Sequence, residues 1–125
     1  MNRIILLTGT VFLALAVIIG AFGAHALKPR ITEDLMQVYR TGVEYHFYHA
    51  LGLLLIGILG FSIPSPLIGW SAFFLSAGIV LFSGSLYLLA LTGIHWMGAV
   101  TPVGGVSFIA GWILLFLAIW KKMPF

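Results

Sequence analysis

The sequence predicts an all-α integral membrane protein, a four-helix bundle with a short interfacial helix between spans 1 and 2. Three apolar runs contain no charged residue, at residues 4–27, 67–92 and 102–120, and a fourth, at 45–63, is interrupted only by histidine. A helix needs about 20 residues to cross roughly 30 Å of hydrocarbon, so each run can span a bilayer. With 62% hydrophobic and 7% charged residues, the composition suits lipid as the solvent.

The four runs cover most of the 125 residues and leave no soluble domain. We therefore predict one four-span membrane domain over residues 1–125, with spans at about 4–26, 44–62, 66–92 and 102–120. The net charge of +3 comes from basic side chains at the ends of the runs, which suit anionic lipid headgroups better than nucleic acid. Cysteine is absent, so disulfides, thiol chemistry and thiolate metal sites are excluded.

The first span begins with a pattern that imitates a secretory signal, namely Arg3, an apolar run and Ala24-His25-Ala26. Its apolar run of about 22 residues exceeds the usual 7 to 15 of such signals, so we expect it to remain as a helix. We expect that helix to stop before Lys28, because a proline follows and disfavours helix in its predecessor.

Helix start and stop signals mark the remaining elements. Thr32 is expected to cap an amphipathic interfacial helix over 33–43, which lies on the membrane surface or within the bundle mouth, and Gly42 to bend the chain into the second span. Ser65 is the expected N-cap of the third span, with a proline in its first turn, and Gly93 is its expected end. Thr101 is the expected cap of the fourth span.

Each span carries a stripe of small or weakly polar residues, which are the expected inward faces because membrane helices approach closely at such residues. The stripes are Thr10, Ala14, Ala21 and His25; His49, Gly52, Ile56 and Gly60; Ala72, Ser76, Ser83 and Tyr87; and Gly104, Ser107, Gly111 and Ala118.

Four crossings place both termini and the turn at residues 63–66 on one side, called side A, and the connections at 28–43 and 93–100 on side B. Each side has three basic residues, so the positive-inside rule gives no orientation. The free α-amino group favours side A as the cytoplasmic side. We expect a multi-pass protein of the bacterial inner (cell) membrane with cytoplasmic termini.

This topology brings all four histidines to side B. His46 and His49 are separated by about 60° around a helix, so both can face one neighbour, as in metal-binding or haem-binding pairs. With His25 they form a candidate site for a metal, a cofactor or protons. The alternative is a structural network in which the imidazoles bond to backbone carbonyls and to hydroxyls such as those of Ser83 and Tyr87.

Two charged residues stand at the rim of this candidate polar cluster. Glu44 points about 200° away from His46 and is expected to pair with Arg40, four residues before it. The cluster thus comprises His25, Arg40, Glu44, His46, His49, Ser83 and Tyr87. Any metal would use His25 and His49; the sequence itself requires no cofactor and contains no catalytic motif, so we do not expect an enzyme.

Four segments carry a family resemblance: GAFGAHAL at 20–27, TGVEYHFYHAL at 41–51, FSGSLY at 82–87 and TPVGG at 101–105. Together they resemble the bacterial family called domain of unknown function 423, and transmembrane protein 256 of eukaryotes is similar to it. The resemblance covers essentially the whole chain. It implies a small four-span inner-membrane protein of a family without a settled activity, with His25 and His49 as the best matches among the histidines.

The sequence therefore favours a structural or accessory membrane protein that acts through contacts with lipids, a second copy of itself or another membrane protein. The alternative is a histidine-dependent proton or ion transporter, or a protein that binds metal or haem.

Overall fold

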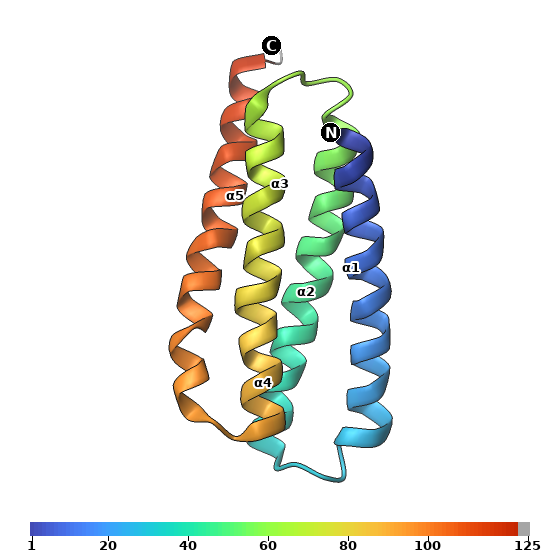
Figure 1. The fold of residues 1–125 in the computed structure, drawn as a ribbon, viewed down its shortest axis with the longest axis vertical. Helices are drawn as coiled ribbons and strands as arrows, with labels where there is room; N and C mark the ends of the chain where they lie inside the picture. Colours follow the sequence, from blue (N-terminus) through green and yellow to red (C-terminus); the bar gives the residue numbers. More distant parts are fainter. Residues whose placement is uncertain (123–125) are drawn as a thin grey trace.

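The computed structural model describes residues 1–122 and folds them into four long helical segments (Figure 1). Each segment is long and apolar enough to cross a membrane, which confirms the predicted all-α four-helix architecture. The elements in chain order are α1 (Asn2–Phe22), η1 (Gly23–Leu27), α2 (Glu33–Leu59), α3 (Pro66–Gly78), η2 (Ile79–Ser83), α4 (Gly84–Thr92), η3 (His95–Ala99) and α5 (Thr101–Lys122).

The helices run up and down, so that α1 begins and α5 ends at the same end of the bundle, beside the α2–α3 turn (Figure 1). The connections between η1 and α2 and between α4 and α5 lie at the opposite end. The end with the α2–α3 turn is side A, and the end with the other two connections is side B. In the lateral arrangement α1 packs on α2, α2 packs on α3, η2 and α4, and α3 packs on α5, whereas α1 touches α3 only weakly.

One continuous helix replaces the predicted interfacial helix and bend. Thr32 caps it as expected, since its hydroxyl accepts a hydrogen bond from the backbone N–H of Leu35 at 3.2 Å. The separate helix over 33–43 and the bend at Gly42 are wrong, because the helix continues unbroken from Glu33 to Leu59; of the two predicted positions, the structure supports the one within the bundle, where Met36 and Tyr39 are buried. Met36 and Tyr39 pack there in a small core with Leu27 and Ala90.

The other helix ends follow local sequence signals, with one exception. Ser65 caps α3, Pro66 stands in its first turn, and Gly93 ends α4 with φ at 70°, a left-handed conformation that glycine adopts readily. Thr101 differs from its predicted capping role. Its hydroxyl oxygen lies 2.6 Å from that of Ser85, so it joins α5 to α4.

Two π-helical turns interrupt the spans, and neither was predicted. In η1 the N–H of Lys28 bonds to the carbonyl of Gly23, five residues earlier, at 3.0 Å. In η2 the N–H of Gly84 bonds in the same way to the carbonyl of Ile79. Such a turn fits an extra residue into the helix and rotates the faces that follow it.

The inward face of the fourth span was predicted correctly, since Gly104, Ser107, Gly111 and Ala118 are all buried. The stripe predicted for the first span is wrong, because all four of its residues are exposed: Thr10, Ala14, Ala21 and His25. A second series of small residues, Gly9, Ala16 and Gly23, faces α2 instead. Its seven-residue spacing is the repeat that keeps one helix face against a neighbour.

Candidate functional site

Four side chains form a cluster between the first three spans, called here the buried polar cluster. Tyr39, His46 and Ser83 are buried, and Tyr87 is partly buried; His46 lies at the middle of α2 and the other three lie nearer side B. Nδ1 of His46 lies 2.8 Å from the Tyr87 hydroxyl oxygen, and the Ser83 hydroxyl donates to the carbonyl of Gly42 at 2.7 Å. The Tyr39 hydroxyl donates to the carbonyl of Ile19. These bonds link the first three spans to one another, as polar side chains do inside a membrane.

Glycine and the π-helical turns make room for the cluster. A Cβ atom on Gly42 would lie 2.8 Å from the ring of Tyr87, and a Cβ atom on Gly23, the first residue of η1, would overlap the ring of Tyr39. Ser83 is the last residue of η2. Each π-helical turn therefore lies directly beside a member of the cluster, a placement common at functional sites.

His46 is the member with an unmet hydrogen-bonding group. The residue is 3% exposed, and Nε2 is the one buried side-chain nitrogen or oxygen within residues 1–122 without a well-formed hydrogen bond, although the Phe12 backbone of α1 interacts with this imidazole. The Phe12 ring of α1 packs edge-on against the imidazole at 5.9 Å. An unpaired polar atom in an apolar interior costs about 1–3 kcal/mol, so this nitrogen calls for a physical explanation.

His49 has different neighbours although it lies one turn further along α2. Its Nδ1 is 2.8 Å from the carbonyl oxygen of Tyr45, and its ring stacks on that of Phe108 at 3.5 Å. Phe108 belongs to α5, whereas His46 faces α1 and α4. The prediction that both imidazoles face one neighbour is wrong. The 60° between them is enough to turn His46 toward α1 and α4 and His49 toward α5.

The histidines do not gather at one mouth. His25 in η1 and His95 in η3 are exposed near side B. Because α2 begins at Glu33, His46 lies thirteen residues into the helix, about 20 Å from its start. Within residues 1–122 no three His, Cys, Asp or Glu side chains lie close enough to hold one metal ion.

The charged residues of the predicted rim line a small cleft between α1 and α2. Nη1 of Arg40 donates to Glu33, two turns earlier, at 3.1 Å, so the predicted pairing of Arg40 with Glu44 is wrong. The cleft, called here the α1–α2 cleft, has a volume of about 270 Å³. Its lining residues are Gly20, Ala24, Lys28, Met36, Tyr39, Arg40, Val43 and Glu44.

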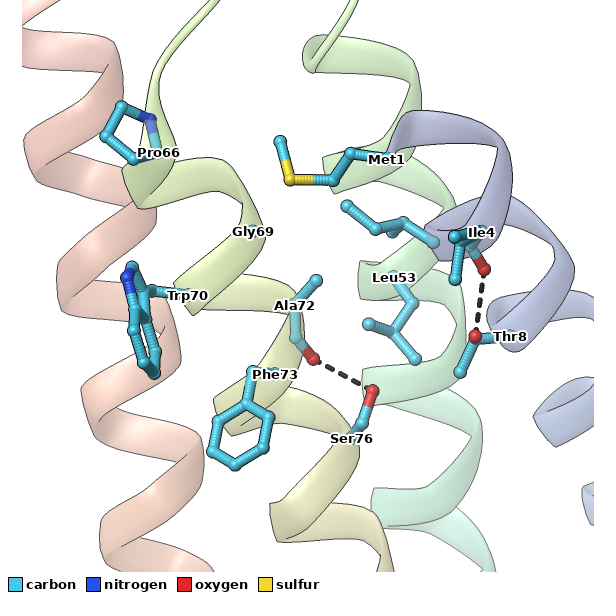
Figure 2. Close-up of a pocket in the computed structure, with 11 residues that line it drawn as sticks. Met1, Ile4, Thr8, Leu53, Pro66, Gly69, Trp70, Ala72, Phe73 and Ser76 are labelled. Atoms are coloured by element: carbon cyan, nitrogen blue, oxygen red, sulfur yellow. Dashed lines mark hydrogen bonds between the residues drawn. The ribbon is translucent and has the colours of Figure 1, made fainter.

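A larger groove, which sequence reasoning missed, lies between α1 and α3 in the half of the bundle near side A (Figure 2). This α1–α3 groove has a volume of about 650 Å³ and is lined mainly by apolar side chains, with Leu53 of α2 behind it. The hydroxyls of Thr8 and Ser76 bond to the carbonyls of Ile4 and Ala72 on their own helices, each at 2.8 Å. The groove wall therefore offers no free hydroxyl donor to an occupant.

Comparisons of the sequence with known proteins identify a family for this chain. The family model described as "Protein of unknown function (DUF423)" matches residues 19–105, a range that includes the buried polar cluster and the α1–α2 cleft. The chain is similar to the UPF0382 membrane protein YwdK of Bacillus subtilis, with 46% identity over 97% of this chain and 99% of the relative.

Two staphylococcal relatives match to a similar extent. The UPF0382 membrane protein of Staphylococcus saprophyticus is 45% identical over 95% of this chain and 98% of its own length. That of Staphylococcus haemolyticus is 41% identical over 95% and 97%. No solved structure matches the chain. Together with the four membrane-spanning helices, these matches show that the chain is a membrane protein that belongs to the DUF423 family.

Proposed function

We propose that this protein is a non-enzymatic accessory protein of the bacterial cell membrane that holds a lipid acyl chain in the α1–α3 groove. The observation that carries the proposal is the groove itself. It is mainly apolar, it opens between two spans that barely touch, and it is lined by residues of the first two turns of α1 and the first three turns of α3, both spans long enough to cross a membrane. No catalytic function is assigned to it.

The chemistry of the wall favours an acyl chain as the occupant. Both hydroxyls in the groove are already bonded to backbone carbonyls, and the donors that remain are the indole N–H of Trp70 and the α-ammonium of Met1, so a polar occupant would find few partners along most of the groove. An alkyl chain loses none, and it gains dispersion contacts along the groove. At side A, Met1 extends toward Gly69 of α3, where its sulfur would lie 2.7 Å from an added Cβ atom (Figure 2).

Native mass spectrometry of gently extracted protein tests the proposal. We expect a retained phospholipid on the parent protein and loss of most of it in Gly69→Leu, whose side chain enters the groove. Ala14→Leu is the matched control, because Ala14 lies on the exposed face of α1 away from the groove lining. A parent protein without lipid, or a dimer that Gly69→Leu separates, would overturn the acyl-chain assignment.

The orientation belongs to the same proposal, with both termini in the cytoplasm. The absence of cysteine from the sequence makes single-cysteine labelling straightforward. Ser62→Cys on side A and Arg30→Cys on side B are both at exposed positions in turns. We expect an impermeant thiol reagent added to whole cells to label the side-B cysteine alone; labelling of the side-A cysteine alone would reverse the orientation.

A second candidate function is proton transport through His46, favoured by its buried Nε2, which makes no well-formed hydrogen bond. An imidazole with one nitrogen bonded to Tyr87 and the other without a well-formed hydrogen bond has a lone pair or a proton to exchange, depending on its tautomer. In proteoliposomes with an imposed pH gradient, proton flux lost in His46→Gln and kept in His49→Gln supports this function. Absence of flux in the parent protein eliminates it.

A further inference from the structure

We infer that the α1–α2 cleft binds the headgroup of a phospholipid that carries both a phosphate and a primary ammonium. This inference rests on the proposed lipid-binding function and names a headgroup class for a second lipid, on side B. The cleft lies at the opposite end of the bundle from the α1–α3 groove, so the two occupants would belong to opposite leaflets.

The cleft displays opposite charges that do not neutralise each other. Lys28 and Glu44 both line it and are exposed, and the side chain of neither makes a hydrogen bond or ion pair within residues 1–122. Arg40 uses one N–H on Glu33, and a guanidinium has five, so donors remain for an anion. Two cations and one carboxylate therefore surround the same small volume.

The position and size of the cleft suit a headgroup. Lys28 directly follows η1, where the first span ends, and Arg40 and Glu44 lie two to three turns into α2. The remaining walls are mostly apolar, with the small residues Gly20 and Ala24 on the α1–η1 side. The volume of about 270 Å³ is less than half that of the α1–α3 groove, so the acyl chains would remain in the bilayer.

The signs of the charges select among headgroups. A phosphate accepts hydrogen bonds from Lys28 and Arg40, as basic pockets between spans bind lipid phosphates. Glu44 repels a headgroup that carries only negative charge. A primary ammonium has three N–H donors for that carboxylate, whereas a quaternary choline group has none. The cleft therefore matches a phosphoethanolamine-type headgroup better than phosphoglycerol or phosphocholine.

Lipid exchange followed by native mass spectrometry tests this match. The purified protein is incubated with vesicles of phosphatidylethanolamine, phosphatidylglycerol or phosphatidylcholine that have identical acyl chains. We expect the parent protein to retain phosphatidylethanolamine about fivefold better than the other two, a ratio equivalent to one exposed ion pair of about 1 kcal/mol. Glu44→Gln should abolish this preference, and Lys28→Gln should weaken retention of all three lipids at the cleft.

The control is Lys121→Gln, which removes a cation near side A and should change nothing in the headgroup preference. Equal retention of phosphatidylglycerol by the parent protein, or a preference that survives Glu44→Gln, would overturn the inference. Gly69→Leu separates the two proposals, because it empties the groove and leaves the cleft intact. Lipid retained in the groove without any headgroup preference would refute the headgroup inference alone. A protein that retains no lipid at all would refute both the headgroup inference and the acyl-chain proposal.

Discussion

His46 and Tyr87 connect two spans through one hydrogen bond, with Nδ1 of His46 on α2 lying 2.8 Å from the hydroxyl oxygen of Tyr87 on α4. The contact lies in a water-poor interior, where His46 is 3% exposed and its other nitrogen makes no well-formed hydrogen bond. Whichever atom donates, the bond satisfies one polar group on each helix. Its removal would leave the imidazole without its one well-formed hydrogen bond.

We therefore expect Tyr87→Phe to lower the free energy of unfolding by about 1 kcal/mol, the upper part of the range for interhelical hydrogen bonds in membranes. Unfolding in mixed micelles with increasing denaturing detergent measures the change. Tyr48→Phe is the control, because Tyr48 is exposed and its hydroxyl makes no hydrogen bond within residues 1–122. Equal stabilities of the two variants would contradict the assigned role of the bond.

Two serines join α3 and α5 reciprocally and give a second prediction. Ser71 donates to the carbonyl of Gly111, and Ser107 donates to that of Phe74, each at 2.7 Å. We expect Ser71→Ala and Ser107→Ala each to cost about 0.6 kcal/mol in unfolding free energy, a typical value for a hydrogen bond between membrane helices. The control is Ser76→Ala, whose hydroxyl bonds within its own helix; a loss as large there would refute the interhelical explanation.

The sequence predicts the four spans and most of their ends because these depend on local chemistry. Apolar length identifies each span, and the caps at Thr32 and Ser65 and the stop at Gly93 need only the residues beside them. The inward face of the fourth span can likewise be predicted from that helix alone, since its predicted series of small residues is the one that is buried.

The errors arise where two local patterns compete or where packing decides. The first span contains two series of small residues, and the structure buries the one through Gly9 rather than the one through Thr10. The amphipathic stretch over 33–43 fits a membrane surface or a bundle interior equally well, and Tyr39 decides the matter by bonding to the first span. The surroundings of the His46 imidazole depend on contacts from two other spans, which no spacing in one helix reveals.

Close backbone packing at Gly104 gives a third prediction. A Cβ atom at Gly104 would overlap the backbone nitrogen and Cα of Phe82, which cannot move aside as a side chain can. We expect Gly104→Ala to lower the thermal stability in detergent and to cost about 2 kcal/mol, as overpacking does. The neighbouring Gly105→Ala brings its Cβ atom no closer than 3.9 Å to the Phe82 ring and should be neutral or stabilising. A stable Gly104→Ala protein would show that these helices are further apart.

The π-helical turn η1 gives the last prediction, since its first residue, Gly23, lies against Tyr39. A Cβ atom at Gly23 would overlap the tyrosine ring, so Gly23→Ala must displace it and break its hydrogen bond to Ile19. We expect a loss of about 2 kcal/mol in the parent background and much less in Tyr39→Ala, a coupling that a double-mutant cycle measures. Gly20→Ala, whose Cβ atom would lie 3.4 Å from Val43, should be tolerated. Equal costs of Gly23→Ala in both backgrounds would show that Tyr39 is not the residue that requires glycine at this position.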